Sequence, residues 1–245
     1  MGLLGVIRSG GGLINVLACV ISAAVVVFLV MPIHEYAHGF VAEKLGDPTP
    51  RWQGRMSLNP LKHIDYMGAL MIFLIGFGWA KPVQVDSRYF KNEKRGMALT
   101  ALAGPLSNII CAILFSFIRF TLLTVLVKTD VMSYSYEVFR YDSQSYLATF
   151  MVLLNYILEL IVVINLSLAV FNLIPIPPLD GSKILYAVLP DRIYWNIMRY
   201  ERYLYFALII LLFVGSGLSG FLSRIVYLLY DLIKLITFLP FKLLL

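Results

Sequence analysis

The chain has 245 residues, of which 60% are hydrophobic and only 14% are charged, and its formal net charge is +6 at pH 7. Soluble globular chains carry about 45–50% apolar and about 25% charged residues. This composition therefore excludes a disordered protein, a coiled coil, a basic nucleic-acid-binding module and an ordinary soluble enzyme. It predicts an all-α polytopic membrane protein, a bundle of about four to six transmembrane helices.

The first predicted helix starts near Leu13 and continues past Pro32 to about Lys44. A helix needs about 20 apolar residues to cross the hydrocarbon core of a membrane. The apolar run is too long for a secretory signal, and no small-residue cleavage site closes it. We therefore expect a membrane span here.

A shorter apolar stretch follows at 67–80 and contains Gly68, Gly76 and Gly78. At about 14 residues it is too short and too rich in glycine for a clean span. It is typical of a re-entrant or loop segment. Gly76 and Gly78 could expose backbone there.

Two clear spans are expected next, at 97–127 and 146–174, and two C-terminal helical segments at 203–214 and 221–241. A Gly/Ser-rich break is expected between the last two, at 215–220. The final segment carries Arg224, Asp231 and Lys234 on roughly one helical face. We expect it either to lie in the membrane interface or to pack as a short span with its polar stripe inward.

Lysine and arginine are distributed unevenly between the connections. The stretch 44–95 holds nine of the twenty basic residues, the connection 128–145 holds two, and 175–202 holds four. Because cytoplasmic loops of membrane proteins collect positive charge, the first and third stretches are expected in the cytoplasm and the N-terminus outside. The positive net charge then reflects how the chain is oriented in the membrane and does not indicate a nucleic-acid partner.

The pattern His34-Glu35-x-x-His38 carries the clearest chemistry in the chain. Residues four apart share one face of a helix, so both imidazoles can reach one Zn²⁺ ion. Glu35 can then act as general base toward a zinc-activated water. Ionisable residues that continue an apolar helix are costly and usually functional.

A catalytic zinc site needs a third protein ligand. His63 in a basic loop, Glu159 inside the span 146–174 and Asp180 after it are the candidates. Glu159 is placed deep in its span, whereas Asp180 follows a span that ends on the expected cytoplasmic side. An extended, proline-rich segment could turn Asp180 back toward the metal.

The chain resembles the site-2 protease family of intramembrane zinc metalloproteases. Four motifs carry the resemblance, in the family's order: His34–His38, Gly76–Val83, Ala103–Asn108 and Asn172–Gly181. The resemblance implies that Asp180 is the third ligand to one Zn²⁺ ion. It implies that Gly76–Val83 is a short re-entrant, β-like loop, where Gly76 and Gly78 could let a substrate add as an extended strand. It also implies cleavage of transmembrane substrate helices near the cytoplasmic side of the cell membrane, that is, regulated intramembrane proteolysis.

Ser57–His63 resembles the compact prokaryotic branch of the family. We expect no PDZ domain, for which there is no room between the first two motifs, and no C-terminal CBS domain. We expect a single metalloprotease domain over 1–245, with a catalytic core at about 12–185. Asn172 and Asn108 are candidate supporting residues, and Gly104-Pro105 is interpreted as a packing and kink device. The alternatives are a metal-binding transporter and a non-catalytic scaffold that binds membrane helices.

Overall fold

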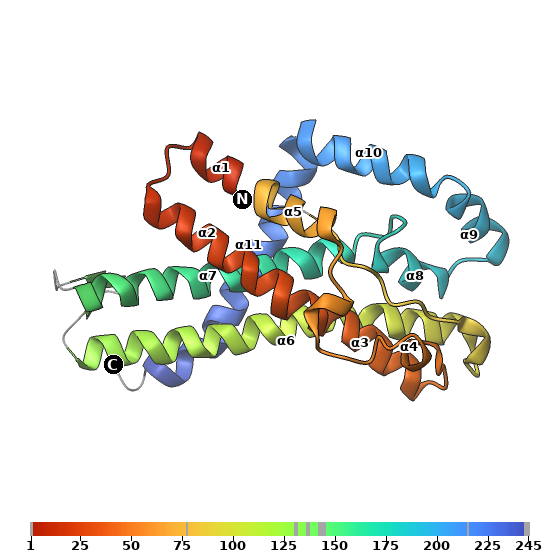
Figure 1. Cartoon of the computed structure of the whole chain (residues 1–245), viewed down its shortest axis with the longest axis horizontal. Coiled ribbons are helices and arrows are strands. Elements are labelled where there is room, and N and C mark those ends of the chain that lie inside the picture. The colour runs from red at the N-terminus through yellow and green to blue at the C-terminus, as the bar shows by residue number, and fades with distance from the viewer. Residues whose placement is uncertain are drawn as a thin grey trace.

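The computed structural model describes residues 2–76, 78–129, 132–135, 138–141, 146–214 and 216–242, and these form mainly helices (Figure 1). The helices are α1 Leu3–Arg8, α2 Leu13–Val25, α3 Met31–Lys44, α4 Thr49–Trp52, α5 Tyr66–Ile75, α6 Glu93–Lys128, α7 Tyr146–Asn172, α8 Asp180–Tyr186, α9 Asp191–Met198, α10 Glu201–Val214 and α11 Ser216–Lys242. A small antiparallel hairpin of β1 Met132–Ser135 and β2 Val138–Tyr141 connects α6 to α7. The predicted all-α class is confirmed.

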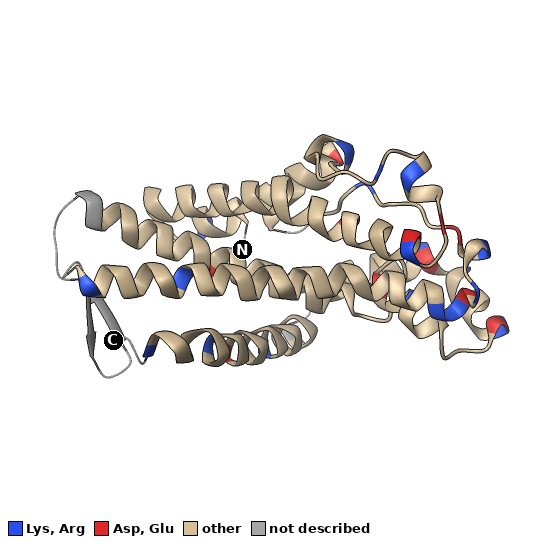
Figure 2. Cartoon of the chain, turned by 90° about the horizontal axis from the view of Figure 1, so that it is seen from below, with Lys and Arg blue, Asp and Glu red and all other residues tan. Residues whose placement is uncertain are grey.

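Three helical stretches in the described chain are long and apolar enough to cross a membrane: Leu13–Lys44, Glu93–Lys128 and Thr149–Asn172. They correspond to the three long spans expected from the sequence. α6 and α7 run side by side along the long axis of the molecule, and α2 and α3 cross them (Figure 1). Acidic and basic residues gather mainly at one end of these helices, where α3 ends and α6 begins (Figure 2).

The first span passes through Pro32 without ending. A proline inside an α-helix loses one hydrogen bond and its ring clashes with the carbonyl four residues earlier, here that of Phe28. The five residues Val26–Val30 form a π-helical turn immediately before the proline. This wider turn places the proline in a helix that continues to Lys44, so α2 and α3 form one span.

The apolar stretch at 67–80 folds mainly as the ten-residue helix α5, which ends at Gly76 with a positive φ of 77°. β character is limited to one bridge between Ile64 and Ala80. Gly68 lets the chain return closely over α5, because a Cβ atom there would lie 2.9 Å from the amide nitrogen of Trp79. This return directs the residues after Ala80 toward α3.

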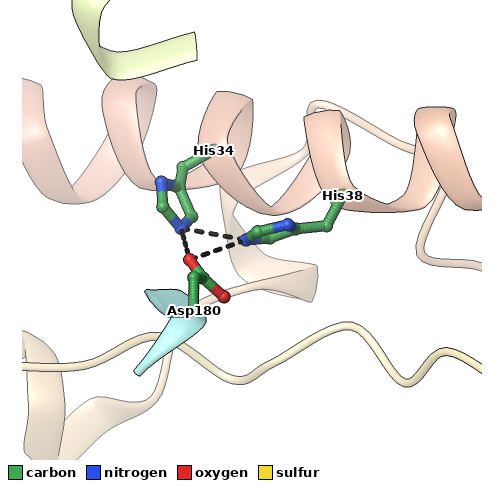
Figure 3. Close-up of side chains that lie close together, drawn as sticks. All are labelled: His34, His38 and Asp180. Carbon is green, nitrogen blue, oxygen red and sulfur yellow. Dashed lines mark hydrogen bonds and ion pairs between the residues drawn. The ribbon is translucent and has the colours of Figure 1, made fainter. Parts of the chain in front are cut away.

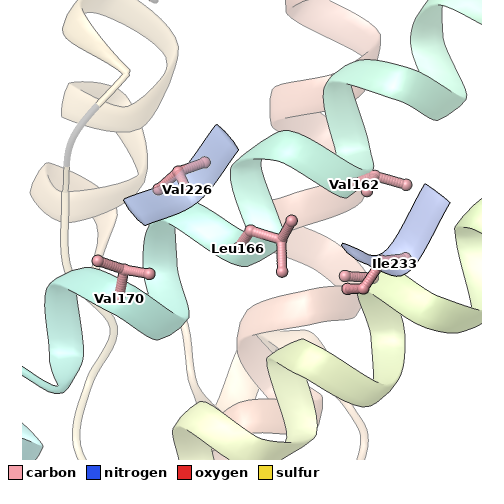
Figure 4. Close-up of a cluster of buried hydrophobic side chains, with 6 residues drawn as sticks. Val162, Leu166, Val170, Val226 and Ile233 are labelled. Atoms are coloured by element: carbon pink, nitrogen blue, oxygen red, sulfur yellow. The ribbon is translucent and has the colours of Figure 1, made fainter. Parts of the chain in front are cut away.

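α11 packs on α6 and α7 through apolar side chains. Figure 4 shows Val226 and Ile233 of α11 against α7. The α7 side chains in this cluster are Val162, Leu166 and Val170.

Of the two positions expected for the C-terminal segment, the one with an inward polar stripe was wrong. Arg224, Asp231 and Lys234 are exposed, so the polar stripe does not pack inward. The expected break is also shorter, because α11 begins at Ser216. A helix satisfies its backbone hydrogen bonds internally, and in lipid that requirement outweighs the low helix propensity of glycine and serine.

Candidate metal centre

His34 and His38 lie one turn apart on α3, and their side chains converge (Figure 3). The two Nε2 atoms are 3.1 Å apart. The rings meet edge to face, with an interplanar angle of 84°. Their lone pairs therefore point toward a common position without the rings stacking.

Asp180 reaches this position from the first residue of α8. Its Oδ2 lies 3.4 Å from His34 Nε2 and 3.2 Å from His38 Nε2. The segment after α7 turns tightly, with hydrogen bonds from Ile176 to Ile174 and from Leu179 to Ile176. Gly181 permits this turn, because a Cβ atom there would lie only 2.5 Å from the carbonyl oxygen of Ile174.

These three side chains fit a tetrahedral zinc ion. Bonds of about 2.0–2.1 Å to a tetrahedral metal place neighbouring ligand atoms about 3.3 Å apart. The three separations here are 3.1, 3.2 and 3.4 Å. Two imidazoles and one carboxylate form a donor set typical of catalytic zinc, which leaves one coordination position for the reaction. His34, His38 and Asp180 could therefore hold one metal ion.

Neighbouring groups prepare the ligands for a cation. Nδ1 of His38 donates a hydrogen bond of 2.7 Å to the carbonyl oxygen of Thr100, which leaves Nε2 with its lone pair free. Burial acts to raise the pKa of the Asp180 carboxyl, but electrostatic interaction with His38 and His34 holds that pKa below its usual range. The carboxylate is therefore ionised at neutral pH.

Gly104 of α6 lies directly against both imidazoles. A Cβ atom there would come within 2.5 Å of Cε1 of His38 and 2.6 Å of Cε1 of His34. Only glycine leaves this space to the rings. The Gly104-Pro105 pair was interpreted as a packing and kink device, and the packing is against the metal ligands themselves.

Glu35 is buried beside the ligands on α3. Its Oε2 accepts a hydrogen bond of 2.9 Å from the backbone N–H of Val83. This bond joins the carboxylate to the extended segment after Ala80. The segment therefore borders the metal centre, and it fixes one oxygen of Glu35.

The other two candidates for the third ligand have different environments. His63 is buried, and its Nε2 donates to the carbonyl oxygen of Ser57 at 2.7 Å, so it holds its own loop together. Glu159 forms an ion pair of 3.1 Å with Arg119 of α6. Neither belongs to the group of metal-binding side chains found in the described chain.

The sequence reasoning missed Arg119, although a lone arginine inside the span 97–127 is a visible signal. Its guanidinium donates to Asn155, Glu159 and the hydroxyl of Tyr230. Tyr230 in turn donates to Glu159 at 2.9 Å. The charge is therefore neutralised within the bundle and ties α6, α7 and α11 together.

Two asparagines were also expected to support the site. Asn108 is 1% exposed and sits one turn after Gly104 on α6; within the described residues neither atom of its amide has a hydrogen-bond partner. Asn172 ends α7, ahead of the turn that carries Asp180. Roles for Asn108, Asn172, Gly76 and Gly78 in substrate binding stay predictions.

Comparison with known proteins agrees with this geometry. The family model described as "Peptidase family M50" matches residues 22–215. "Putative zinc metalloprotease YwhC" of Bacillus subtilis (strain 168) is 37% identical over 75% of this chain and 76% of its own length. "Putative zinc metalloprotease Rip2" of Mycobacterium tuberculosis (strain ATCC 25618 / H37Rv) is 27% identical over 82% of this chain and 69% of its own. No solved structure matches significantly. The chain belongs to peptidase family M50, the site-2 protease family, and is a zinc metalloprotease.

Proposed function

We propose that this protease cleaves transmembrane helices of other proteins within the membrane, near its cytoplasmic side. The observation that carries the proposal is the position of the metal centre. His34 and His38 lie on a helix that continues a 32-residue apolar stretch, Leu13–Lys44. A protease that cleaves water-soluble substrates does not need metal ligands on a membrane-spanning helix, where ionisable residues are costly.

Glu35 is the proposed general base. Zn²⁺, when bound, supplies Lewis-acid polarisation of the scissile carbonyl and acidifies water. Glu35 accepts the proton of the attacking water and delivers it to the leaving nitrogen. The hydrogen bond from Val83 fixes one carboxylate oxygen, which leaves the other oriented for this transfer.

The cytoplasmic placement rests on charge. The basic stretch 44–95 follows α3, and by the positive-inside rule it lies in the cytoplasm, with the N-terminus outside. His38 is six residues before Lys44, so the centre lies about 9 Å from that end of the helix. A substrate helix must unwind there, because its carbonyls are otherwise hydrogen-bonded internally.

The loop at Gly76 and Gly78 and the two asparagines are proposed to receive the unwound strand. An orphaned amide such as that of Asn108 can bond a substrate carbonyl or amide at no cost to the fold. These residues would bind the substrate, whereas Glu35 and the metal ligands would carry out the hydrolysis.

The test is cleavage of a transmembrane substrate in lipid vesicles by the wild type and by Glu35→Gln. The variant should keep one zinc per chain and lose cleavage by about 10²–10⁴-fold, the usual contribution of general acid–base catalysis. Glu43→Gln is a matched control on the same helix, because Glu43 pairs with Arg51 outside the centre. Cleavage retained by Glu35→Gln contradicts the role of Glu35. Cleavage of soluble peptides alone contradicts the intramembrane substrate.

A further inference from the structure

The exposed face of α11 carries Arg224 and, seven residues later, two opposite charges one turn apart. Asp231 and Lys234 both point away from the bundle, because the side chains that pack inward are Val226, Ile233 and Thr237. No ion pair joins Asp231 to Lys234 in the part of the chain that the structure describes. Figure 2 shows α11, near the marked C-terminus, along the outside of the molecule with charged residues on it.

These charges lie at membrane depth. Tyr230, which precedes Asp231, donates a hydrogen bond to Glu159 of α7. Glu159 is ten residues after Thr149 and thirteen before Asn172, which bound the third candidate span. At 1.5 Å per residue it is about 15 Å from one end and about 20 Å from the other. Asp231 therefore lies at the level of the middle of this candidate span.

The surroundings of the two charges are apolar and exposed. Leu228, Leu232 and Leu235 are 71%, 52% and 65% exposed. Such leucines face lipid in a membrane protein, whereas a carboxylate or an ammonium group there is costly unless it is paired. The face thus has two charges that need partners and no partner within the described chain.

We propose that this face of α11 is a homodimer interface in which Asp231 of each copy pairs with Lys234 of the other. A two-fold axis along the membrane normal keeps both copies in the same orientation and brings this face against itself. Asp231 and Lys234 are self-complementary under that operation, and Arg224 lies two helical turns before Asp231. A different protein on this face would need its own acidic and basic residues at matching positions.

One glycine on the same face, Gly220, allows close approach. Gly220 and Tyr227 precede Asp231 by eleven and four residues and so lie on its side of the helix. A Cβ atom added at Gly220 would meet nothing within 4 Å. Small residues on an exposed membrane helix let a second helix pack closely.

The first test uses charge reversal with two differently tagged copies expressed together. Asp231→Lys makes the pair wholly positive, and Lys234→Asp makes it wholly negative. Each variant alone should form at least tenfold less dimer than the wild type, measured by subunit counting in lipid vesicles. The two variants together should form a mixed dimer at the wild-type level. Monomers throughout, or full dimerisation of each single variant, overturns the proposal.

The second test uses cysteine cross-linking after the native Cys19 and Cys111 are replaced by serine. Tyr227→Cys should give a disulfide-linked dimer in membranes. Ile236→Cys is the matched control, because Ile236 is also exposed (53%) but lies on a different side of α11 from Asp231. If both variants cross-link equally, the disulfides form by random collision between copies, and the proposed interface is overturned. Cross-linking of Tyr227→Cys to a different protein also overturns it, because the occupant is then not a second copy.

Discussion

Gly104→Ala is the sharpest test of how the fold builds the metal centre. The added Cβ atom would lie 2.6 Å from Cε1 of His34 and 2.5 Å from Cε1 of His38. Ordinary carbon contacts are about 3.5–4.0 Å, so each ring must move by about 1 Å. That displacement exceeds the tolerance of ligand distances at a zinc site, about 0.2 Å. We expect zinc to bind about 100-fold more weakly, the upper range for lost support around a metal.

The magnitude follows from linkage between binding and stability. Zinc at 100 times its wild-type Kd stabilises the folded protein by about 2.7 kcal/mol. With a 100-fold weaker Kd, the same zinc concentration gives only about 0.4 kcal/mol. The zinc-dependent stabilisation should therefore fall by about 2.3 kcal/mol. The metal-free protein should lose at most about 2.5 kcal/mol, because the better helix propensity of alanine offsets part of the overpacking cost of about 1–3 kcal/mol.

The assay is thermal unfolding in detergent with and without zinc, together with zinc Kd by chelator competition. Gly217→Ala is the matched control, since a Cβ atom on this glycine of α11 would meet nothing within 4 Å. It should keep the wild-type zinc affinity. If Gly104→Ala binds zinc and cleaves substrate like the wild type, the proposed crowding of the two imidazoles is refuted.

Three further predictions follow from other contacts. Removal of zinc by a chelator should abolish cleavage and lower Tm, and added zinc should restore both; retained cleavage contradicts metal catalysis. His63→Ala should destabilise the protein by about 1–3 kcal/mol through the unpaired carbonyl of Ser57, while the zinc content by metal analysis stays at one per chain. Arg119→Met should destabilise by about 3–5 kcal/mol because it leaves Glu159 unpaired, and the double variant Arg119→Met/Glu159→Gln should recover most of that loss in unfolding measurements.

The three long spans were predictable from sequence because lipid imposes a simple rule. A segment with about 20 apolar residues must satisfy its backbone hydrogen bonds internally, so it becomes a helix. The span that starts at Leu13 extended past Pro32 as expected. The short stretch at 67–80 was less predictable. Its ten-residue helix depends on the close backbone approach of Gly68 and Trp79, which no local pattern encodes.

The C-terminal part shows where local patterns failed. A Gly/Ser-rich stretch favours a break in water, yet Ser216–Gly220 is helical. The stripe of Arg224, Asp231 and Lys234 was placed on one face correctly, and of its two expected positions only the inward one was wrong. A hydrophobic pattern with charges on one side does not say which side packs on the bundle, and here Val226 and Ile233 decide it.

By itself, the sequence determined the membrane class, the two-histidine zinc motif on a helix, and three candidates for the completing ligand. Only the tertiary structure brings Asp180 within 3.4 Å of His34 and 3.2 Å of His38. It also shows that Glu159 forms an ion pair with Arg119 and that His63 is hydrogen-bonded within its own loop. The physical reason is distance along the chain: helical periodicity fixes residues four apart, whereas the packing of α6 and the turn before α8 join residues 146 positions apart.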